Sequence, residues 1–150
     1  MISKLLKIGT AMAFGLALVT TQSALAAGDH SIASHKLVLQ ISSADPGVQH
    51  LVLNNAVNIK KHWGDDIDVV IVAYGPGLSM LIPNKTNKEA KRVASLASQG
   101  IAFDACHNTM MGIKKKTGKL PALVKGVKVV PAGLARIIEL EEKGYSYVRP

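Results

Sequence analysis

The run IDVVIVAYG, residues 67–75, constrains the fold of this chain more than any other stretch. It is a nearly continuous series of apolar, mostly β-branched residues, and it does not alternate with polar ones. A strand with this pattern is covered on both of its faces, as strands are in parallel sheets. We therefore expect a sheet with helices packed on both sides.

Strand patterns and helix patterns alternate along the rest of the chain. The other expected strands are residues 36–42, 101–105, 127–133 and 145–150. The expected helices are residues 48–63, 88–98, 109–116 and 134–144, with a loop between residue 75 and the second helix. Asp45 and Pro46 fit the start of the first helix, and Gly64 fits its end. The alternation predicts an α/β fold, a three-layer α/β/α sandwich with a mostly parallel five-stranded sheet. The strand order does not follow from the pattern.

Residues 1–26 contain the three parts of a secretory signal peptide. Lys4 and Lys7 give a positive start, an apolar run follows to about residue 19, and Ala24-Leu25-Ala26 fits a cleavage site. The alternative is an uncleaved membrane anchor, but a spanning helix needs about 20 apolar residues and this run is shorter. We expect cleavage after Ala26, a periplasmic location and no stable membrane span. A polar spacer at 27–35 and one domain at 36–150 would remain.

Composition narrows the classes of function. The chain has one cysteine, so it cannot form an internal disulfide. Its formal net charge of +8 would suit nucleic acid, an anionic membrane or small anions. Nucleic acid is not expected as a partner, because the protein is expected to be exported. Its few aromatic residues also do not interleave with the basic ones as they do in single-strand binders.

The only cysteine, Cys106, follows the expected strand 101–105 and precedes a helix. Ligands of open α/β sheets bind beyond the carboxyl ends of the strands, and amides at a helix N-terminus favour a thiolate. No acidic residue occurs from Ala105 to Ile138. The basic residues of that stretch are Lys114, Lys115, Lys116, Lys119, Lys125, Lys128 and Arg136. These charges would lower the pKa of the thiol and attract anions. Alternatively, the lysines are a solvated face and Cys106 is a small buried hydrophobic residue.

Other kinds of site fit the sequence less well. The stretch GIKKKTGKL resembles a phosphate-binding loop, but its glycines are spaced too widely and Leu120 stands where Ser or Thr would bind a metal. We expect no cofactor and no metal. One soft-ligand set, Cys106, His107, Met110 and Met111, would suit Cu(I). The alternative for the two methionines is packing in the core of a short helix.

Several segments resemble the exported branch of the DsrE/DsrF-like (YchN-like) family. They are KLVLQIS, HLVLNNAVNI, DVVIVAYGPGLSML, GIAFDACHNTM and VVPAGLARIIELEEKGYSYVRP, in order from Lys36 to the C-terminus. The resemblance implies a parallel α/β domain that assembles into trimers or hexamers. In the sulfur-relay members, a cysteine in the matching loop carries sulfane sulfur as a persulfide, and that cysteine is Cys106 here. Relay members are cytoplasmic and some members lack the cysteine, so the fold alone implies no activity.

Residues and resemblance together predict a periplasmic sulfur-handling protein. Cys106 would be the nucleophile and carrier, and His107 would poise its thiol. The residues expected to bind the substrate are Asn108, Thr109, Gly75 and Gly77. The expected partners are a small sulfur-containing anion, an acceptor thiol protein and further copies of the chain in a homotrimer or homohexamer. The alternative is a non-catalytic ligand-binding or assembly module in which Cys106 only packs.

Overall fold

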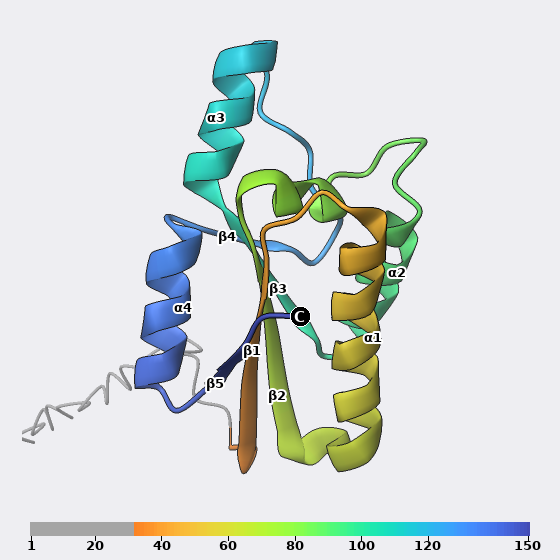
Figure 1. Cartoon of the computed structure of the whole chain (residues 1–150), viewed down its shortest axis with the longest axis vertical. Helices are drawn as coiled ribbons and strands as arrows, with labels where there is room; N and C mark the ends of the chain where they lie inside the picture. The colour runs from red at the N-terminus through yellow and green to blue at the C-terminus, as the bar shows by residue number, and fades with distance from the viewer. Residues whose placement is uncertain (1–31) are drawn as a thin grey trace, which may run out of the picture. The chain divides into compact units, whose positions relative to one another are not determined.

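The computed structural model describes residues 32–150. The expected signal peptide, residues 1–26, lies outside the described residues, as does most of the expected spacer. The elements follow one another in the order β1 (His35–Ile41), α1 (Pro46–Trp63), η1 (Gly64–Asp66), β2 (Ile67–Ala73), η2 (Gly75–Leu81), α2 (Glu89–Ser98), β3 (Ala102–Cys106), α3 (His107–Thr117), β4 (Lys128–Val130), α4 (Gly133–Glu142) and β5 (Ser146–Val148), as Figure 1 shows. Within 32–150, no helix is long and apolar enough to cross a membrane.

The five strands form one sheet in the order β4-β3-β2-β1-β5, and every neighbouring pair is parallel. The chain runs from β1 to β4 in one direction across the sheet and then returns to place β5 beside β1. Parallel crossovers are right-handed, so this reversal of direction puts α4 on the face opposite α1 and α2 (Figure 1). The structure confirms the predicted α/β fold with its mostly parallel five-stranded sheet.

Two clusters of buried side chains fill the spaces on either side of the sheet. The larger one includes Val69 and Ile71 of β2 and packs under α1 and α2. The smaller one includes Val70 and Val72 of the same strand and packs under α4. Successive side chains of β2 therefore enter opposite clusters, which explains why its sequence does not alternate with polar residues.

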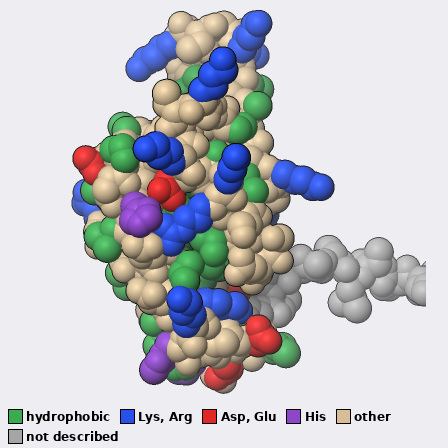
Figure 2. All heavy atoms as spheres, turned by 90° about the vertical axis from the view of Figure 1, so that its right-hand side faces the viewer, with side chains coloured by type: hydrophobic (Ala, Val, Ile, Leu, Met, Phe, Trp, Pro, Cys, Tyr) green, Lys and Arg blue, Asp and Glu red, His purple; other side chains and the backbone are tan. Residues whose placement is uncertain are grey.

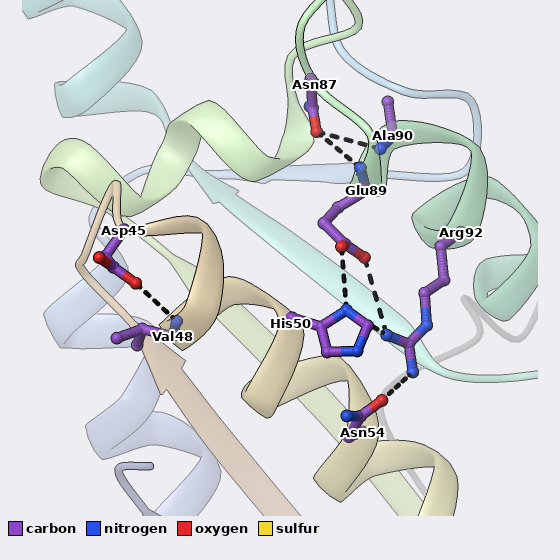
Figure 3. A network of polar contacts seen from close by, with 8 residues as sticks. All are labelled: Asp45, Val48, His50, Asn54, Asn87, Glu89, Ala90 and Arg92. Atoms are coloured by element: carbon purple, nitrogen blue, oxygen red, sulfur yellow. Dashed lines mark hydrogen bonds and ion pairs between the residues drawn. The ribbon is translucent and has the colours of Figure 1, made fainter.

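The first helix begins and ends at the predicted residues. The Val48 amide donates to Asp45 Oδ1 at 3.0 Å, and Pro46 occupies the first helical position (Figure 3). Gly64 follows the helix with a φ of 58°, a value that few other residues adopt without strain. At the start of α2, Asn87 Oδ1 accepts hydrogen bonds from the amides of Glu89 and Ala90. Side-chain oxygens thus satisfy amides at the N-termini of both helices.

A polar network joins the outer surfaces of α1 and α2 (Figure 3). His50 Nδ1 lies 3.1 Å from Glu89 Oε1, and Arg92 donates to Asn54 Oδ1 at 2.6 Å. His50 is exposed, and exposed ion pairs contribute only about 0–1 kcal/mol. The network therefore orients α2 on α1, while the core beneath supplies most of the stability.

The segment after β2 differs from its prediction. Residues 75–87 were expected to form a loop, but Gly75–Leu81 is the 3-10 helix η2. Leu78, Met80 and Leu81 are fully buried in the larger cluster, so the segment is part of the core. Gly77 passes so close to β1 that a Cβ built on it would lie 2.4 Å from the Ile41 carbonyl oxygen. Burial of these apolar residues overrides the turn-forming character of the GPG sequence.

The third helix is also longer than its prediction. It was expected near residues 109–116, and it spans His107–Thr117. It therefore begins at the residue directly after Cys106, so that Cys106 itself is the N-cap residue. Figure 1 shows α3 extending beyond the carboxyl ends of the strands.

Candidate functional site

The carboxyl ends of four strands are aligned at one edge of the sheet. Ile41 of β1 pairs with Ala73 of β2, and Cys106 of β3 pairs with Val130 of β4. The chain leaves this edge toward η2 after β2, toward α3 after β3 and toward α4 after β4. The thiol of Cys106 therefore lies where ligands of open α/β sheets bind.

Donors from the starts of two helices surround the Cys106 sulfur. The Cys106 side chain makes no capping hydrogen bond to α3, but the hydroxyl and the amide of Thr109 and the amide of Asn108, all in the first turn of α3, lie close enough to lower the pKa of its thiol. The amide of Gly133, the first residue of α4, does so from the other side. The side chain is only 5% exposed. Two helix N-termini thus converge on one buried sulfur, an arrangement that stabilises negative charge.

These contacts set the ionisation of the thiol. Burial raises the pKa of Cys106, because it removes water from the thiolate. The hydrogen bonds from Thr109, Gly133 and Asn108 act in the opposite direction and together outweigh burial, so the pKa is lowered from its ordinary value. The site therefore favours a thiolate despite being secluded.

The lysines of the acid-free stretch are not among the main causes of this pKa shift, in which the sequence interpretation gave them a part. None of them is among the groups that alter the pKa of Cys106. Lys114, the nearest along α3, lies about 12 Å from Cys106 along the helix at a rise of about 1.5 Å per residue. Charges of exposed side chains are largely screened beyond the Debye length of about 8 Å at physiological ionic strength.

Thr109 relays a hydrogen bond from η2 to the sulfur. Its Oγ1 accepts from the Gly75 amide at 2.9 Å, which leaves the hydroxyl proton to point at Cys106. Gly75 has a φ of 53°, a region that favours glycine and that aims its amide at Thr109. The Thr109 oxygen is therefore held by η2 as well as by α3 before any substrate arrives.

A backbone hydrogen bond and a buried ion pair hold α4 in place beside the Cys106 thiol. The Asn108 amide also donates to the Pro131 carbonyl at 3.3 Å, which joins the start of α3 to the loop before α4. Arg136 Nε donates to Asp104 Oδ2 at 2.7 Å, and both of these side chains are buried. The ion pair joins α4 to β3 two residues before Cys106, so the position of the Gly133 amide is determined from both sides.

Tyr74 lies beside the site and was not predicted. A Cβ built on Gly133 would lie 3.0 Å from the Tyr74 side chain, so the ring packs directly on this glycine. Burial raises the pKa of Tyr74, the neighbouring Tyr147 and Cys106 raise it further, and Arg149 offsets part of the rise. The tyrosine hydroxyl therefore stays protonated near the thiolate.

The structure gathers some of the predicted site residues and separates others. Asn108 and Thr109 contact the thiol, and Gly75 reaches it through Thr109. His107 is exposed and is not among the groups that shift the pKa of Cys106. Gly77 is buried against β1. The amide of Gly133 had only one sequence signal, its place in a PAG segment after a strand.

The other predicted or possible sites can be placed as well. Within residues 32–150, no three histidine, cysteine or acidic side chains are grouped to hold a metal. Met110 packs in the larger core cluster, which is the packing role considered for it above. A cavity of about 550 Å³ opens at the amino ends of β1 and β2, near Trp63 and Asn58, at the opposite edge of the sheet from Cys106.

Comparison with known proteins bears on the fold. No family model matches the chain, and no curated protein matches it either. The protein of unknown function MTH1491 from Methanobacterium thermoautotrophicum is similar in structure, with a TM-score of 0.68, 27% identity and coverage of 77% of this chain and 99% of that chain. The ychN protein from E. coli is similar with a TM-score of 0.61, 15% identity and the same coverages. The chain has a YchN-like fold.

The YchN-like, or DsrE-like, fold agrees with the resemblance drawn from the sequence. Both matches cover nearly the whole of the other protein, so the described domain corresponds to a complete domain of this architecture. At these identities the fold is shared, and the chemistry has to be argued from the site itself.

Proposed function

We propose that this protein carries sulfane sulfur as a persulfide on Cys106, and that it does so in the periplasm after the leader is removed. One observation carries the proposal: a secluded thiol whose pKa is lowered by donors from two helix N-termini. A thiolate is the nucleophile in sulfur transfer, and the same donors would stabilise the negative terminal sulfur of a persulfide. The YchN-like fold supports the proposal through its DsrE-like architecture.

Uptake of sulfur would be a displacement at a sulfur atom. The Cys106 thiolate attacks the outer sulfur of thiosulfate, the new Sγ–S bond forms, and the S–S bond of thiosulfate breaks to release sulfite. With a polysulfide, the leaving group is the polysulfide shortened by one sulfur. In either reaction the persulfide keeps the single negative charge of the thiolate, so no external oxidant or reductant is needed.

Delivery would repeat the displacement in the opposite sense. The thiolate of an acceptor protein attacks the outer sulfur of the Cys106 persulfide, forms a new persulfide on the acceptor, and releases Cys106 as a thiolate. The chain has one cysteine, so no second thiol of the same chain can discharge the persulfide as an internal disulfide. The sulfur would remain on Cys106 until another molecule collects it.

The seclusion of the thiol favours one alternative. Cys106 is 5% exposed, and buried cysteines often serve only as small apolar residues. In that case the protein would be a non-catalytic binding or assembly module of the same fold. The two functions differ in whether a small reagent reaches the thiol of the native protein.

Mass spectrometry tests the proposal directly. Wild type and Cys106→Ser are incubated with polysulfide and with thiosulfate, and their intact masses are measured before and after treatment with a reducing agent. We expect wild type alone to gain one or more sulfur atoms, and reduction to remove them. The carrier function is wrong if wild type gains none from either donor, or if the serine variant gains as much.

A second measurement separates the alternative function. Iodoacetamide is added to native wild type at neutral pH, and circular dichroism is recorded for wild type and Cys106→Ser. The carrier function requires labelling of the native thiol and a serine variant that folds. A thiol that reacts only after denaturation, together with a misfolded serine variant, would establish the packing role.

A further inference from the structure

The lysines in the last turns of α3 are not needed to ionise the Cys106 thiol. Lys114, Lys115 and Lys116 are exposed, and none of them alters the pKa of Cys106. Figure 2 shows lysine side chains, and no acidic ones, around the tip that α3 forms beyond the sheet. A cluster of exposed like charges attracts negatively charged partners.

A groove connects one of these lysines, Lys116, with Thr109 of the thiol site. One face of α3 lines it with Thr109, Gly112, Ile113 and Lys116, and η2 lines the other side with Gly75 and Pro76. Its volume is about 410 Å³. Thr109, which donates to the Cys106 sulfur, lies at one end, and Lys116 lies about 10 Å farther along the helix axis.

The length of this groove excludes a small anion as the ligand that uses both ends. Thr109 and Lys116 are about two helical turns apart along α3, whereas a small anion such as thiosulfate occupies only part of such a groove. An extended peptide advances about 3.3 Å per residue, so roughly three residues would reach from Thr109 to Lys116. The groove is therefore matched to a segment of a protein.

The exposed side chains of α3 favour a protein as the binding partner over a membrane surface. Helices that lie in a membrane surface bury a broad face of leucine or aromatic side chains. The exposed residues of α3 are His107, Asn108, Lys114, Lys115, Lys116 and Thr117. They offer positive charge with no such apolar face, as a docking site for an acidic protein surface does.

We propose that the groove between η2 and α3, with Lys116 at its outer end and Lys114 and Lys115 on the adjoining faces of α3, receives an extended acidic segment of the protein that accepts sulfur from Cys106. This inference rests on the proposed carrier function. The acceptor thiol would enter at the Thr109 end, and carboxylates three or four residues away would pair with Lys116 and its neighbours. The lysines thus select the acceptor, while the helix amides activate the sulfur.

Peptide binding tests the docking site without any sulfur chemistry. The probe is a fluorescein-labelled peptide with serine in place of the acceptor cysteine and glutamates three and four residues later, and its partner probe has glutamines at those positions. Binding to the protein is followed by fluorescence anisotropy at low and high salt. We expect wild type to prefer the acidic peptide, and the triple variant Lys114→Gln/Lys115→Gln/Lys116→Gln to bind it at least about threefold more weakly.

A charge-matched variant controls for net charge. Lys61→Gln/Lys85→Gln/Lys91→Gln removes the same charge from exposed positions on and near the other helices, and its affinity should stay within about twofold of wild type. Equal losses in both variants, or no preference for the acidic peptide, would overturn the proposal. Tighter binding to phosphatidylglycerol vesicles than to the peptide, with the same dependence on the α3 lysines, would overturn it in favour of a membrane surface.

The carrier function and the docking site are tested by independent measurements. Neither peptide can accept sulfur, so their binding does not depend on whether Cys106 forms a persulfide. Peptide binding with no sulfur uptake in the mass measurement would reject the carrier function, and with it the role given to the docked segment. Sulfur uptake without selective peptide binding would leave the carrier function intact and reject the docking site.

Discussion

At the scale of single residues, the decisive group is the hydroxyl of Thr109. It is the only side chain that donates to the Cys106 sulfur among the groups that shift its pKa, and the other donors are backbone amides. Backbone donors cannot be removed by substitution, whereas a hydroxyl can be deleted without changing the shape of the side chain much. Thr109 therefore allows the electrostatics of the site to be changed while its packing is kept.

Thr109→Val should raise the pKa of Cys106, because the variant loses a hydrogen bond that stabilises the thiolate. The pH at which alkylation by iodoacetamide reaches half of its maximal rate would move upward. Hydrogen bonds to charged groups contribute about 1.5–3 kcal/mol, so the rate at neutral pH should fall about tenfold or more. Thr109→Ser keeps the hydroxyl and serves as the control. Identical pH profiles for valine and serine would show that the hydroxyl does not act on the sulfur.

At the scale of elements, η2 holds the site in place through one close approach. Gly77 fits against the Ile41 carbonyl only because it lacks a side chain, and the position of η2 determines where the Gly75 amide meets Thr109. The 3-10 helix η2 therefore contacts both the end of β1, through Gly77, and α3, through Gly75 and Thr109. A substitution at Gly77 should therefore change both the free energy of unfolding and the reactivity of the Cys106 thiol.

Gly77→Ala should destabilise the protein by about 1–3 kcal/mol, since the new methyl group would displace η2 from β1. Gly112→Ala is the matched control, because a Cβ there meets nothing within 4 Å in the middle of α3. That variant should gain about 0.5–1 kcal/mol, the usual advantage of alanine over glycine in a helix. Urea unfolding of the three proteins measures both effects. An unchanged Gly77→Ala variant would mean that η2 can move at little cost.

The sequence predicted correctly those helices and strands that are determined by a few neighbouring residues. The buried run of β2 and the Asp45-Pro46 start of α1 were predicted because each depends on a few neighbouring residues. The strand order depends on pairings between distant segments and left no local signal. The same holds for the Gly133 amide, a backbone group that becomes part of the site only because α4 folds back over β3. The apolar residues of η2 were assigned to a loop because glycine and proline precede them.

At the scale of the whole molecule, one face of α4 is not covered by any other element within residues 32–150. Leu134 is 62% exposed and Ile138, one turn later, is 51% exposed. They lie on the side of α4 away from the smaller core cluster, to which Ile137 and Leu140 belong. Adjacent exposed apolar residues on a helix often mark a contact between subunits.

We expect the protein to be a homotrimer or homohexamer in which this face of α4 is buried. Light scattering should give a mass above that of one chain at micromolar concentrations, and Leu134→Glu/Ile138→Glu should lower it. Leu51→Glu/Leu120→Glu places the same two charges on exposed leucines outside α4, and the oligomer should survive it. A wild type that is monomeric across this range would contradict the expectation.

The strand order also dictates when the domain can be completed. Strands β1, β2 and β3 each pair with the strand that follows in the chain, so their pairing can proceed as the chain lengthens. Strand β5 comes last and pairs with β1, the first strand, across a separation that includes almost the entire domain. Long-range pairing of this kind is slow, because the chain must close a large loop first. Until the final residues are synthesised, β1 keeps an open edge that only β5 covers in the finished sheet.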